Sequence, residues 1–299
     1  MSTNTFVPRG VEFGKSKREK KKVFTVGWFF KTLFLGLLLA FLIVPLIYNF
    51  TYAFKPLNEM IQYPPPIFVK NPTFQNFVDM VLVYANTEIP LLRYVWNSVW
   101  TTAVGMFFTV FVSIICGYSL AKLKVKSATL IFNIIIGSMM ISLSTAAIMS
   151  YKITMALGLY NSYWAYIVPG IANSSYVFLS RQFAEGIPDE LLEAARIDGA
   201  SEFKTFLVIS VPILRPAIAT LGLYSFNALW GSSGPCGMYI VDEAKKNLPY
   251  ALSNAIAGGL ARQGAQAAMG LIMLLPSFIA LIITQSKVVD TMAHAGIKG

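Results

Sequence analysis

Charged residues are scarce in this chain of 299 residues, and cysteine and histidine are scarcer still. Asp, Glu, Lys and Arg make up 13% of the sequence, against about 25% in an ordinary soluble domain. With 56% hydrophobic residues, a soluble monomer would lack the polar residues that must cover its surface. Two cysteines exclude a disulfide scaffold, and the apolar content excludes a disordered chain. The composition predicts a protein that crosses a membrane several times.

Six segments carry no charged residue and are long enough to cross the hydrocarbon, which takes about 20 apolar residues. They are 32–54, 94–121, 127–151, 153–180, 217–241 and 263–286. We expect a loop at Gly158–Ser162 and an end to the fifth helix near Gly231–Gly237. The first segment exceeds the apolar core of about 7–15 residues in a signal peptide, so we interpret it as a retained helix.

The interiors of all six segments contain no Asp, Glu, Lys, Arg or His. This argues against a proton relay, a voltage sensor and an ion-coupled pump, although sodium coupling through carbonyls and hydroxyls stays open. His294 is the single histidine, so a His-based metal site is not expected. The segment Gly10–Ser16 has three residues between its glycines, where a phosphate loop needs four. We expect no metal site, no catalytic residue and no nucleotide site.

The basic residues are unevenly distributed and predict the orientation. Seventeen of the 24 fall in residues 1–31, in the turn at 122–126, in the loop 181–216 or in the tail 287–299. Because basic residues favour the cytoplasmic side, both termini are expected there, as six spans require. The formal charge of +10 then serves to orient the chain in the membrane and to contact anionic lipid headgroups. Nucleic acid is not an expected partner.

The predicted organisation follows from these spans. A basic cytoplasmic tail (1–31) precedes the first helix (32–54) and an external loop (55–93). A core of five helices (94–286) contains the long cytoplasmic loop 181–216, and a cytoplasmic tail (287–299) ends the chain. Cys116 and Cys236 are interpreted as packing or loop positions.

The loop 181–216 predicts two short helices joined at a sharp turn. Pro188 suits a first helical position, and Gly199 suits the left-handed residue that ends a helix. Ser201 can cap the second helix, and Pro212 would close or bend it. Six of the 14 acidic residues lie within 185–202, beside Arg196 alone. Anionic headgroups repel such a face, so a protein partner is favoured over a lipid surface.

Here the chain resembles a known family. Glu193-Ala194-Ala195 is followed after three residues by Gly199, and nine residues later by Ile209-Ser-Val-Pro212. This pattern is similar to the EAA loop of permease subunits in ATP-binding-cassette importers, and its 193–200 form is typical of carbohydrate importers. Further stretches resemble the smaller maltose-type permease: 71–77, 93–98, 117–122, 226–230 and 295–299. The Gly-rich stretches 231–237 and 255–264 are unusual beside the family pattern.

The resemblance implies an all-α integral membrane permease of the type I importer kind, with six transmembrane helices and both termini inside. It implies a multi-pass location in the bacterial cytoplasmic membrane. The implied partners are a second, different permease subunit, two ATPase subunits and an extracellular or periplasmic substrate-binding protein. ATP and Mg would be bound by the ATPase subunits, so this chain would bind no cofactor.

The resemblance also implies roles for individual residues. Those that would couple the chain to an ATPase are Glu193, Ala194, Ala195, Asp198, Gly199 and Ala200. Glu193 would pair with a basic residue, the alanines would pack in a groove, and Gly199 would allow the turn. Gly296, Lys298 and Gly299 in the tail would reach between the ATPases, unless the terminus is simply frayed.

The fifth span offers the chemistry that sugars need. Aromatic faces and hydrogen-bonding groups come together in Tyr224, Ser225, Asn227 and Trp230. Similar polar groups occur at 142–145 and 173–175, although such residues in membrane helices often bond between helices. A neutral lining suits an uncharged sugar, while acidic oligosaccharides stay open. The alternatives are import of another solute, such as a polyamine or an organic phosphate, and a self-sufficient carrier or channel.

Overall fold

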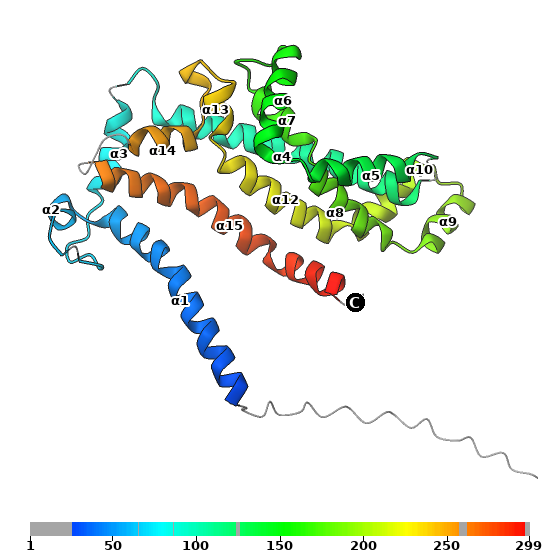
Figure 1. Ribbon diagram of the computed structural model, residues 1–299, viewed down its shortest axis with the longest axis horizontal. Helices are drawn as coiled ribbons and strands as arrows, with labels where there is room; N and C mark the ends of the chain where they lie inside the picture. The colour runs from blue at the N-terminus through cyan, green and yellow to red at the C-terminus, as the bar shows by residue number, and fades with distance from the viewer. Residues whose placement is uncertain (1–25, 65, 86, 124–125, 257–261, 297–299) are drawn as a thin grey trace, which may run out of the picture. The chain divides into compact units, whose positions relative to one another are not determined.

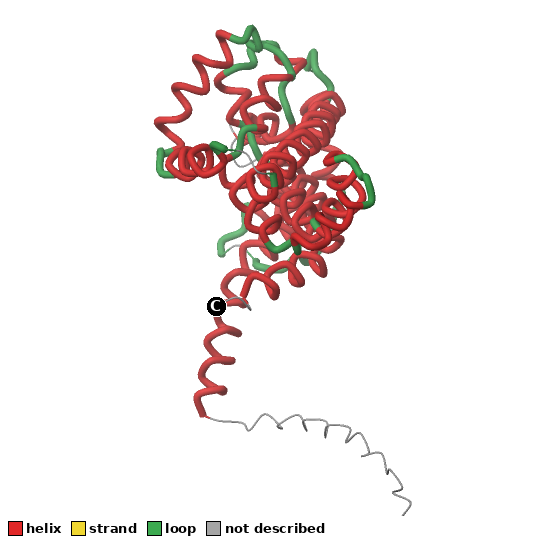
Figure 2. Tube along the Cα trace, turned by 90° about the vertical axis from the view of Figure 1, so that its right-hand side faces the viewer, coloured by secondary structure: helices red, strands yellow, loops and turns green. Residues whose placement is uncertain are grey.

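The computed structural model describes residues 26–64, 66–85, 87–123, 126–256 and 262–296. Within these ranges every regular element is a helix, joined by turns and loops (Figure 2). The chain divides into two compact units, Met1–Ile47 and Tyr48–Gly299. The prediction of an all-helical chain is confirmed for the described residues.

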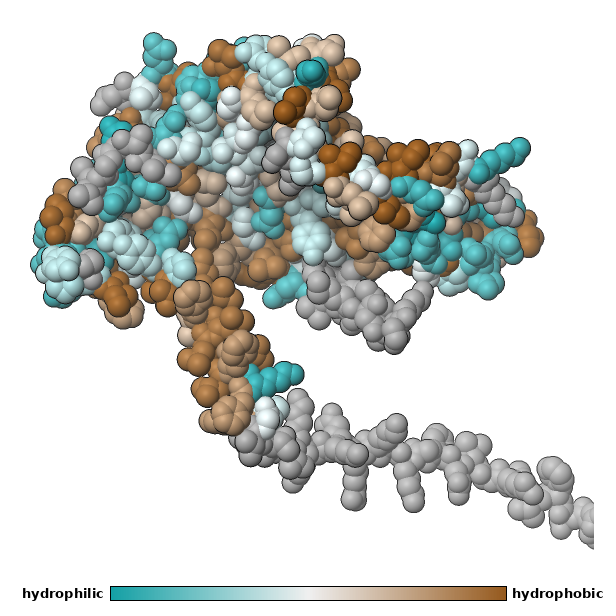
Figure 3. Space-filling model, viewed as in Figure 1, coloured by the Kyte–Doolittle hydropathy of each residue, from teal (hydrophilic) through white to brown (hydrophobic). Residues whose placement is uncertain are grey.

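The described part of the first unit is the beginning of helix α1 (Val26–Phe54). Its large apolar side chains are exposed, Phe41 to 75%, and they cover the surface of the helix (Figure 3). Apolar residues on every side fit surroundings of lipid or of another protein. The helix includes Lys31, so it begins before the expected residue 32, and it ends at the expected residue.

Helix α4 (Leu91–Lys122) is the centre of the second unit (Figure 1). It packs against α7 (Trp164–Ile171), α8 (Ser174–Glu185) and α12 (Arg215–Trp230). Small or polar buried residues recur at every fourth position of α4: Asn97, Thr101, Gly105, Thr109, Ser113 and Gly117. Residues four apart share one helical face, and small side chains there let neighbouring backbones approach closely.

Helix α15 (Gln263–Gly296) packs against α12 and two shorter helices, α3 (Gln75–Ala85) and α14 (Leu248–Ile256). A buried cluster that includes Tyr52, Tyr84, Leu248 and Met269 fills the space near the beginning of α15. This apolar cluster holds the C-terminal end of α1 to the rest of the second unit.

Three described helices, α1, α4 and α15, are each long and apolar enough to cross a membrane. A fourth candidate is the pair formed by 202–213 and 215–230, which is bent by 76°. The expected span at 153–180 contains α7 and α8 as separate helices. Residues 127–151 are also divided, into α5 (Ala128–Met139) and α6 (Leu143–Ala156).

The prediction of one helix over 127–151 is therefore wrong. The break lies at 140–142, where Ser142 is the N-cap of α6 and its hydroxyl accepts the N–H of Thr145 at 3.4 Å. Lys152, expected between two spans, lies inside α6. This local hydrogen bond starts a new helix, α6, at a place in the sequence that no charged residue or proline marks.

Two other interruptions are confirmed. Gly158 and Asn161 adopt left-handed φ values of 69° and 54° between α6 and α7, within the expected loop. Helix α12 ends at Trp230 with Gly231 as its C-cap. Two short elements follow, α13 (Gly234–Met238) and the 3-10 turn η2 (Glu243–Lys245). Of the second Gly-rich stretch, residues 257–261 lie outside the described ranges.

The segment after α1 is folded around two buried charged side chains. Lys55 is fully buried and donates to the carbonyl oxygen of Pro66. Glu59, in the short helix α2 (Leu57–Met60), accepts the backbone N–H groups of Lys70 at 3.0 Å and Asn71 at 2.9 Å. The bond from Lys70, aided by those from Asn71 and by the charge of Lys55, outweighs burial and lowers the pKa of Glu59.

Asn76, at the beginning of α3, joins this segment to α1. Its side-chain nitrogen donates to the carbonyl oxygens of Tyr52, Ala53 and Lys55, at 3.3, 3.0 and 2.8 Å. These carbonyls lie at the C-terminal end of α1, where the regular helical N–H partners run out; that of Tyr52 also accepts the N–H of Lys55 at 3.3 Å. Gly264 allows the contact, because a Cβ there would lie 2.8 Å from the methyl of Met60 and would collide with the Asn76 amide.

Candidate functional site

The first candidate surface is helix α9 (Asp189–Ile197), held against the ends of α4 and α8. Pro188 is its N-cap, one residue before the position we expected. Asp189 lies in the first turn, where a carboxylate interacts favourably with the helix dipole, and it pairs with Lys122 of α4 at 2.7 Å. Leu192 is buried in an apolar cluster that also contains Ile114, Tyr118 and Phe206, and Ala195, three residues further along α9, is buried as well. The helix is therefore fixed to the core by one face.

The turn that ends α9 is a Schellman motif. The N–H of Gly199 bonds to the carbonyl of Arg196, and the N–H of Ala200 bonds to that of Ala195, both at 3.0 Å. Gly199 has a φ of 80°, a left-handed conformation that favours glycine. The expectation that Gly199 ends this helix is confirmed.

Helix α10 (Glu202–Thr205) follows the turn and is tied back to α9. Ser201 caps it, as expected, by accepting the N–H of Lys204 at 3.3 Å. Arg196 donates to both carboxylate oxygens of Glu202, at 2.7 and 3.3 Å. This hydrogen bond raises the pKa of Arg196 above its ordinary value. A two-pronged contact of this kind fixes the angle between the two helices.

Beyond α10 the chain passes through a π-helical turn η1 (Phe206–Ser210) and α11 (Val211–Ile213) before it enters α12. The 76° bend lies between Ile213 and Arg215. Pro212 and Pro216 flank it, in agreement with the expected bend. The short elements α10, η1 and α11 thus connect α9 to α12 without an intervening loop after Ser201.

The outward side of this structure is acidic with apolar residues between the charges. Glu193, Ala194, Asp198 and Gly199 are exposed, and Ala200 is half-buried. Ile197 and Phe203 are exposed to 86% and 68%. Figure 3 shows the hydrophilic residues gathered at the end of the second unit that carries α9 and α10. We call the residues Glu193, Ala194, Ile197, Asp198, Gly199 and Phe203 the α9 surface.

Ala195 is the one residue of the predicted motif that faces inward. It is 9% exposed, whereas its neighbour Ala194 is exposed. The resemblance implied that both alanines pack in a groove of the ATPase. Of the two, only Ala194 has a side chain that is accessible in this structure.

The second candidate region surrounds α12, and it separates the four residues proposed for a substrate path. Tyr224 and Asn227 are exposed, and the Asn227 amide donates to the carbonyl of Leu223 at 3.0 Å. Ser225 is fully buried and donates to the carbonyl of Leu221 at 2.8 Å. Trp230 is 7% exposed, with its ring nitrogen bonded to the carbonyl of Met273 in α15 at 2.8 Å.

Two cavities lie beside α12, and three of these four residues are divided between them, whereas Tyr224 lines neither. A cavity of about 540 Å³ is lined by Asn227, Trp230, Leu252 and Gly270, among others. A cavity of about 250 Å³ is lined by Ser225 and by hydroxyl groups that the sequence did not suggest. These are on Thr101, Thr109, Tyr166, Tyr176, Ser232 and Tyr239. The four-residue repeat of α4 was the available signal, because it contains Thr101 and Thr109.

Polar groups proposed at other spans serve as caps. Asn173 accepts the N–H groups of Ser175 and Tyr176, at 3.0 and 3.3 Å, and so begins α8. Ser142 begins α6, and the hydroxyl of Ser174 meets that of Ser138 at 2.7 Å. Their hydrogen bonds explain local structure without any ligand.

Two further expectations concern the C-terminal tail and metal binding. Gly296 is the last residue of α15, and Lys298 and Gly299 lie outside the described residues, as does Gly10–Ser16. Within the part of the chain that the structure describes, no group of three or more His, Cys, Asp or Glu residues could hold a metal ion.

Known proteins resemble this chain along most of its length. Residues 110–286 match the family described as binding-protein-dependent transport system inner membrane component. Protein LplC of Bacillus subtilis is 33% identical over 213 residues, 71% of this chain and 70% of that one. The arabinooligosaccharides transport system permease protein AraQ of B. subtilis is 28% identical over 277 residues, which cover 89% and 96%.

A solved structure shares the fold. It is that of a bacterial ABC transporter involved in the import of the acidic polysaccharide alginate. The two chains superpose with a TM-score of 0.77 at 18% identity, over 87% of this chain and 96% of the other.

Proposed function

The chain belongs to the family of binding-protein-dependent transport system inner membrane components, and we propose that it is one of two different permease subunits in an ATP-driven importer of a sugar or oligosaccharide. As a family member it is a multi-pass transport subunit of the inner membrane and not an enzyme. The proposed partners are a second permease, two ATPase subunits that bind ATP and Mg, and an external substrate-binding protein.

The α9 surface is the observation that carries this proposal. A short, stiff helix fixed at both ends presents Glu193, Ala194 and Asp198 to the outside. Acidic groups around the exposed Ile197 and Phe203 suit a groove with basic and apolar residues on an ATPase. Because α9 is packed on the ends of the core helices and is linked to α12 through the short elements α10, η1 and α11, movement of the groove would be passed to the transmembrane helices.

Within that surface the residues have separate proposed roles. Glu193 pairs with a basic ATPase residue, and Ala194 allows close approach. Gly199 and Ala200 hold the turn, and Asp198 extends the acidic side. Gly296, Lys298 and Gly299 reach toward the ATPases from the tail. Ala195 contributes from the buried face of α9.

We further propose six membrane crossings, with both termini in the cytoplasm. The third and fourth crossings would each consist of two helices in sequence, α5 with α6 and α7 with α8. The excess of basic residues on the proposed inner side supports this orientation.

The sugar assignment rests on relatives and on the chemistry beside α12. One relative is named for arabinooligosaccharides, and the superposable structure belongs to an importer of an acidic polysaccharide. Asn227 and Trp230 line a cavity large enough for part of a small ligand, since ligand sites range over about 300–1,000 Å³. Trp230 is 7% exposed, whereas Tyr224 and Asn227 are exposed, so Tyr224 and Asn227 are the proposed direct contacts.

Reconstitution tests the proposal. The chain, its neighbouring permease, the ATPase and the binding protein are placed in proteoliposomes, and uptake of labelled oligosaccharide is measured with and without ATP. We expect uptake that requires both ATP and the binding protein. Uptake by this chain alone, or selective uptake of a polyamine or an organic phosphate, would contradict the proposal.

A further inference from the structure

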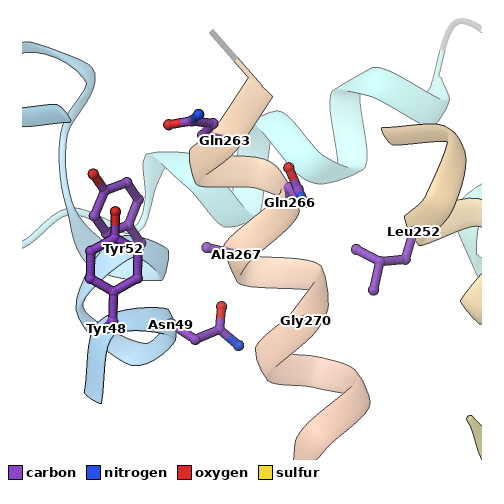
Figure 4. A pocket seen from close by; sticks show the side chains of 8 residues that line it. All are labelled: Tyr48, Asn49, Tyr52, Leu252, Gln263, Gln266, Ala267 and Gly270. Atoms are coloured by element: carbon purple, nitrogen blue, oxygen red, sulfur yellow. The ribbon is translucent and has the colours of Figure 1, made fainter. Parts of the chain in front are cut away.

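A second polar pocket lies between the outer end of α1 and the beginning of α15, apart from the path beside α12. Its volume is about 400 Å³, and all of its lining residues belong to the second unit. Tyr48, Asn49 and Tyr52 come from α1, and Gln263 and Gln266 come from α15. Figure 4 shows the two tyrosine rings side by side and the Asn49 side chain directed at α15.

Three carboxamides in this pocket are free to bind a ligand. The structure gives no hydrogen bond to the side chains of Asn49, Gln263 or Gln266 from any described residue. All three are half-buried. By contrast, Asn97 and Asn247, elsewhere in the second unit, each make two or more side-chain hydrogen bonds. A carboxamide that is partly buried loses hydrogen bonds to water. A ligand that both donates and accepts hydrogen bonds can replace them.

The tyrosines add an aromatic surface. The rings of Tyr48 and Tyr52 are 4.2 Å apart with an angle of 32° between their planes. Tyr52 is buried and carries the Lys55 ammonium 4.4 Å from its ring centre, whereas Tyr48 is 47% exposed. Tyr52 is therefore fixed and supports Tyr48, whose hydroxyl interacts with that of Tyr52 and whose exposed ring surface is available to a ligand.

No charged side chain is among the residues that line the pocket. Carboxylates and phosphates are usually bound by Arg, Lys or several backbone N–H groups, and these are missing from the lining. Carboxamides suit neighbouring hydroxyl groups, since each amide offers donors and an acceptor. The chemistry favours a neutral polyhydroxy ligand over an anionic one.

The pocket adjoins the path beside α12. Leu252 and Gly270 line both this pocket and the cavity of about 540 Å³ that contains Asn227 and Trp230. Gly270 leaves space beside Asn49, because a Cβ there would come within 3.3 Å of the Asn49 amide nitrogen. A ligand in this pocket would therefore lie next to the cavity that contains Asn227 and Trp230.

We propose that this pocket binds one neutral glycosyl unit of the incoming oligosaccharide, at the outer end of the path beside α12. The inference rests on the proposed function, because it assumes that the chain transports carbohydrate. It adds Asn49, Gln263 and Gln266 as sugar-binding residues and Tyr48 as the ring on which the unit packs.

Site-directed labelling tests occupancy directly. Gln266→Cys in the complete transporter is reacted with a maleimide, with and without binding protein loaded with a neutral oligosaccharide. We expect the sugar to slow labelling several-fold. The matched control is Gln285→Cys, an exposed amide at the other end of the same helix, where the rate should not change. Equal rates at position 266, or protection by an acidic uronate oligosaccharide alone, would overturn the proposal.

Uptake measurements separate this inference from the proposed function. In Asn49→Leu and Gln266→Leu, we expect uptake of a subsaturating neutral oligosaccharide to fall by about three- to tenfold, the effect of one lost neutral hydrogen bond. Gln285→Leu should transport normally. Normal uptake by both pocket variants would overturn the pocket alone, whereas no ATP-dependent sugar uptake by the unsubstituted complex would overturn the proposed function as well.

Assembly is the remaining readout. The pocket variants should co-purify with the second permease and the ATPases as the unsubstituted chain does. Loss of the second permease from the Gln266→Leu complex would overturn the proposal, because the amides would then join subunits.

Discussion

At the scale of single residues, Gly117 determines how closely α4 approaches α8. A Cβ at this position would lie 2.7 Å from the backbone nitrogen of Arg181, and a backbone atom cannot turn aside as a flexible side chain can. We expect Gly117→Ala to force the helices apart and to lower the free energy of unfolding by about 1–3 kcal/mol. Thermal denaturation in detergent measures the loss.

Gly222 of α12 provides the matched control for that substitution. A Cβ there would meet no atom within 4 Å. Gly222→Ala should leave the midpoint of thermal denaturation unchanged or raise it, since alanine stabilises a helix by about 1 kcal/mol relative to glycine. Equal effects of the two substitutions would refute the close-approach explanation.

Glu59 gives the segment 55–73 a dependence on pH. Its pKa is lowered below the ordinary value of 4.5, first by the N–H of Lys70 and then by Asn71. A lowered pKa in the folded state means that Glu59 stabilises the segment above pH 4.5 and that this contribution is lost as the pH falls through the lowered pKa. Hydrogen exchange at Lys70 and Asn71, corrected for intrinsic rates, should show protection at neutral pH that disappears in acid.

Glu59→Gln is the control, because an amide of similar shape does not titrate in this range. Protection at the two backbone amides should be weaker in this variant and should no longer change between neutral and acidic pH. A pH step that persists in Glu59→Gln would assign the dependence to another group.

Residue-level predictions from sequence succeeded where the cause was local. Gly199 and Ser201 act on their own turns, and both behave as their chemistry dictates. The orientation of Trp230 depends on a distant partner, because its ring nitrogen bonds to the carbonyl of Met273 in α15. No pattern near Trp230 in the sequence contains that information.

At the scale of elements, the turn between α9 and α10 is the most sensitive joint. Because a Cβ at Gly199 would meet nothing within 4 Å, a substitution there acts through backbone conformation alone. Left-handed backbone costs an ordinary residue about 1–2 kcal/mol, more for a β-branched one and less for asparagine. We expect Gly199→Val to reduce ATP-dependent uptake about tenfold while ATP hydrolysis and membrane insertion persist.

Gly199→Asn separates conformation from other causes, because asparagine tolerates the left-handed region. This variant should keep most of the uptake. If both variants transported normally, the turn would have no part in coupling.

Elements were predicted well where composition changes sharply and poorly where it does not. Helix α1 ends just before Lys55, the first charged residue after the apolar run, and α12 ends just before Gly231, the first residue of a Gly-rich stretch. Both signals are visible in the sequence. The break at 140–142 lies in an apolar stretch, and its one signal is Ser142 three residues before Thr145. Helices α3 and α14 were not predicted, because they lie in segments interpreted only as external loops.

At the scale of the whole molecule, orientation is the feature to test. We expect Lys70→Cys to react with a membrane-impermeant maleimide from outside intact cells and Lys126→Cys to react only after permeabilisation. Both side chains are exposed, so access reflects the side of the membrane. The unsubstituted chain corrects for Cys116 and Cys236. External labelling at residue 126 would reverse the proposed topology.

The hydrogen bonds of Asn76 have a genetic consequence. One nitrogen atom serves three backbone oxygens at the end of α1, so the contact depends on the identity of a single atom. Aspartate copies the outline of asparagine but would replace that nitrogen with a negatively charged oxygen, directed at three others. A single base change converts one codon into the other. Asn76→Asp changes the shape of the side chain very little. Its negative charge, however, should break the contact that joins α3 to the end of α1.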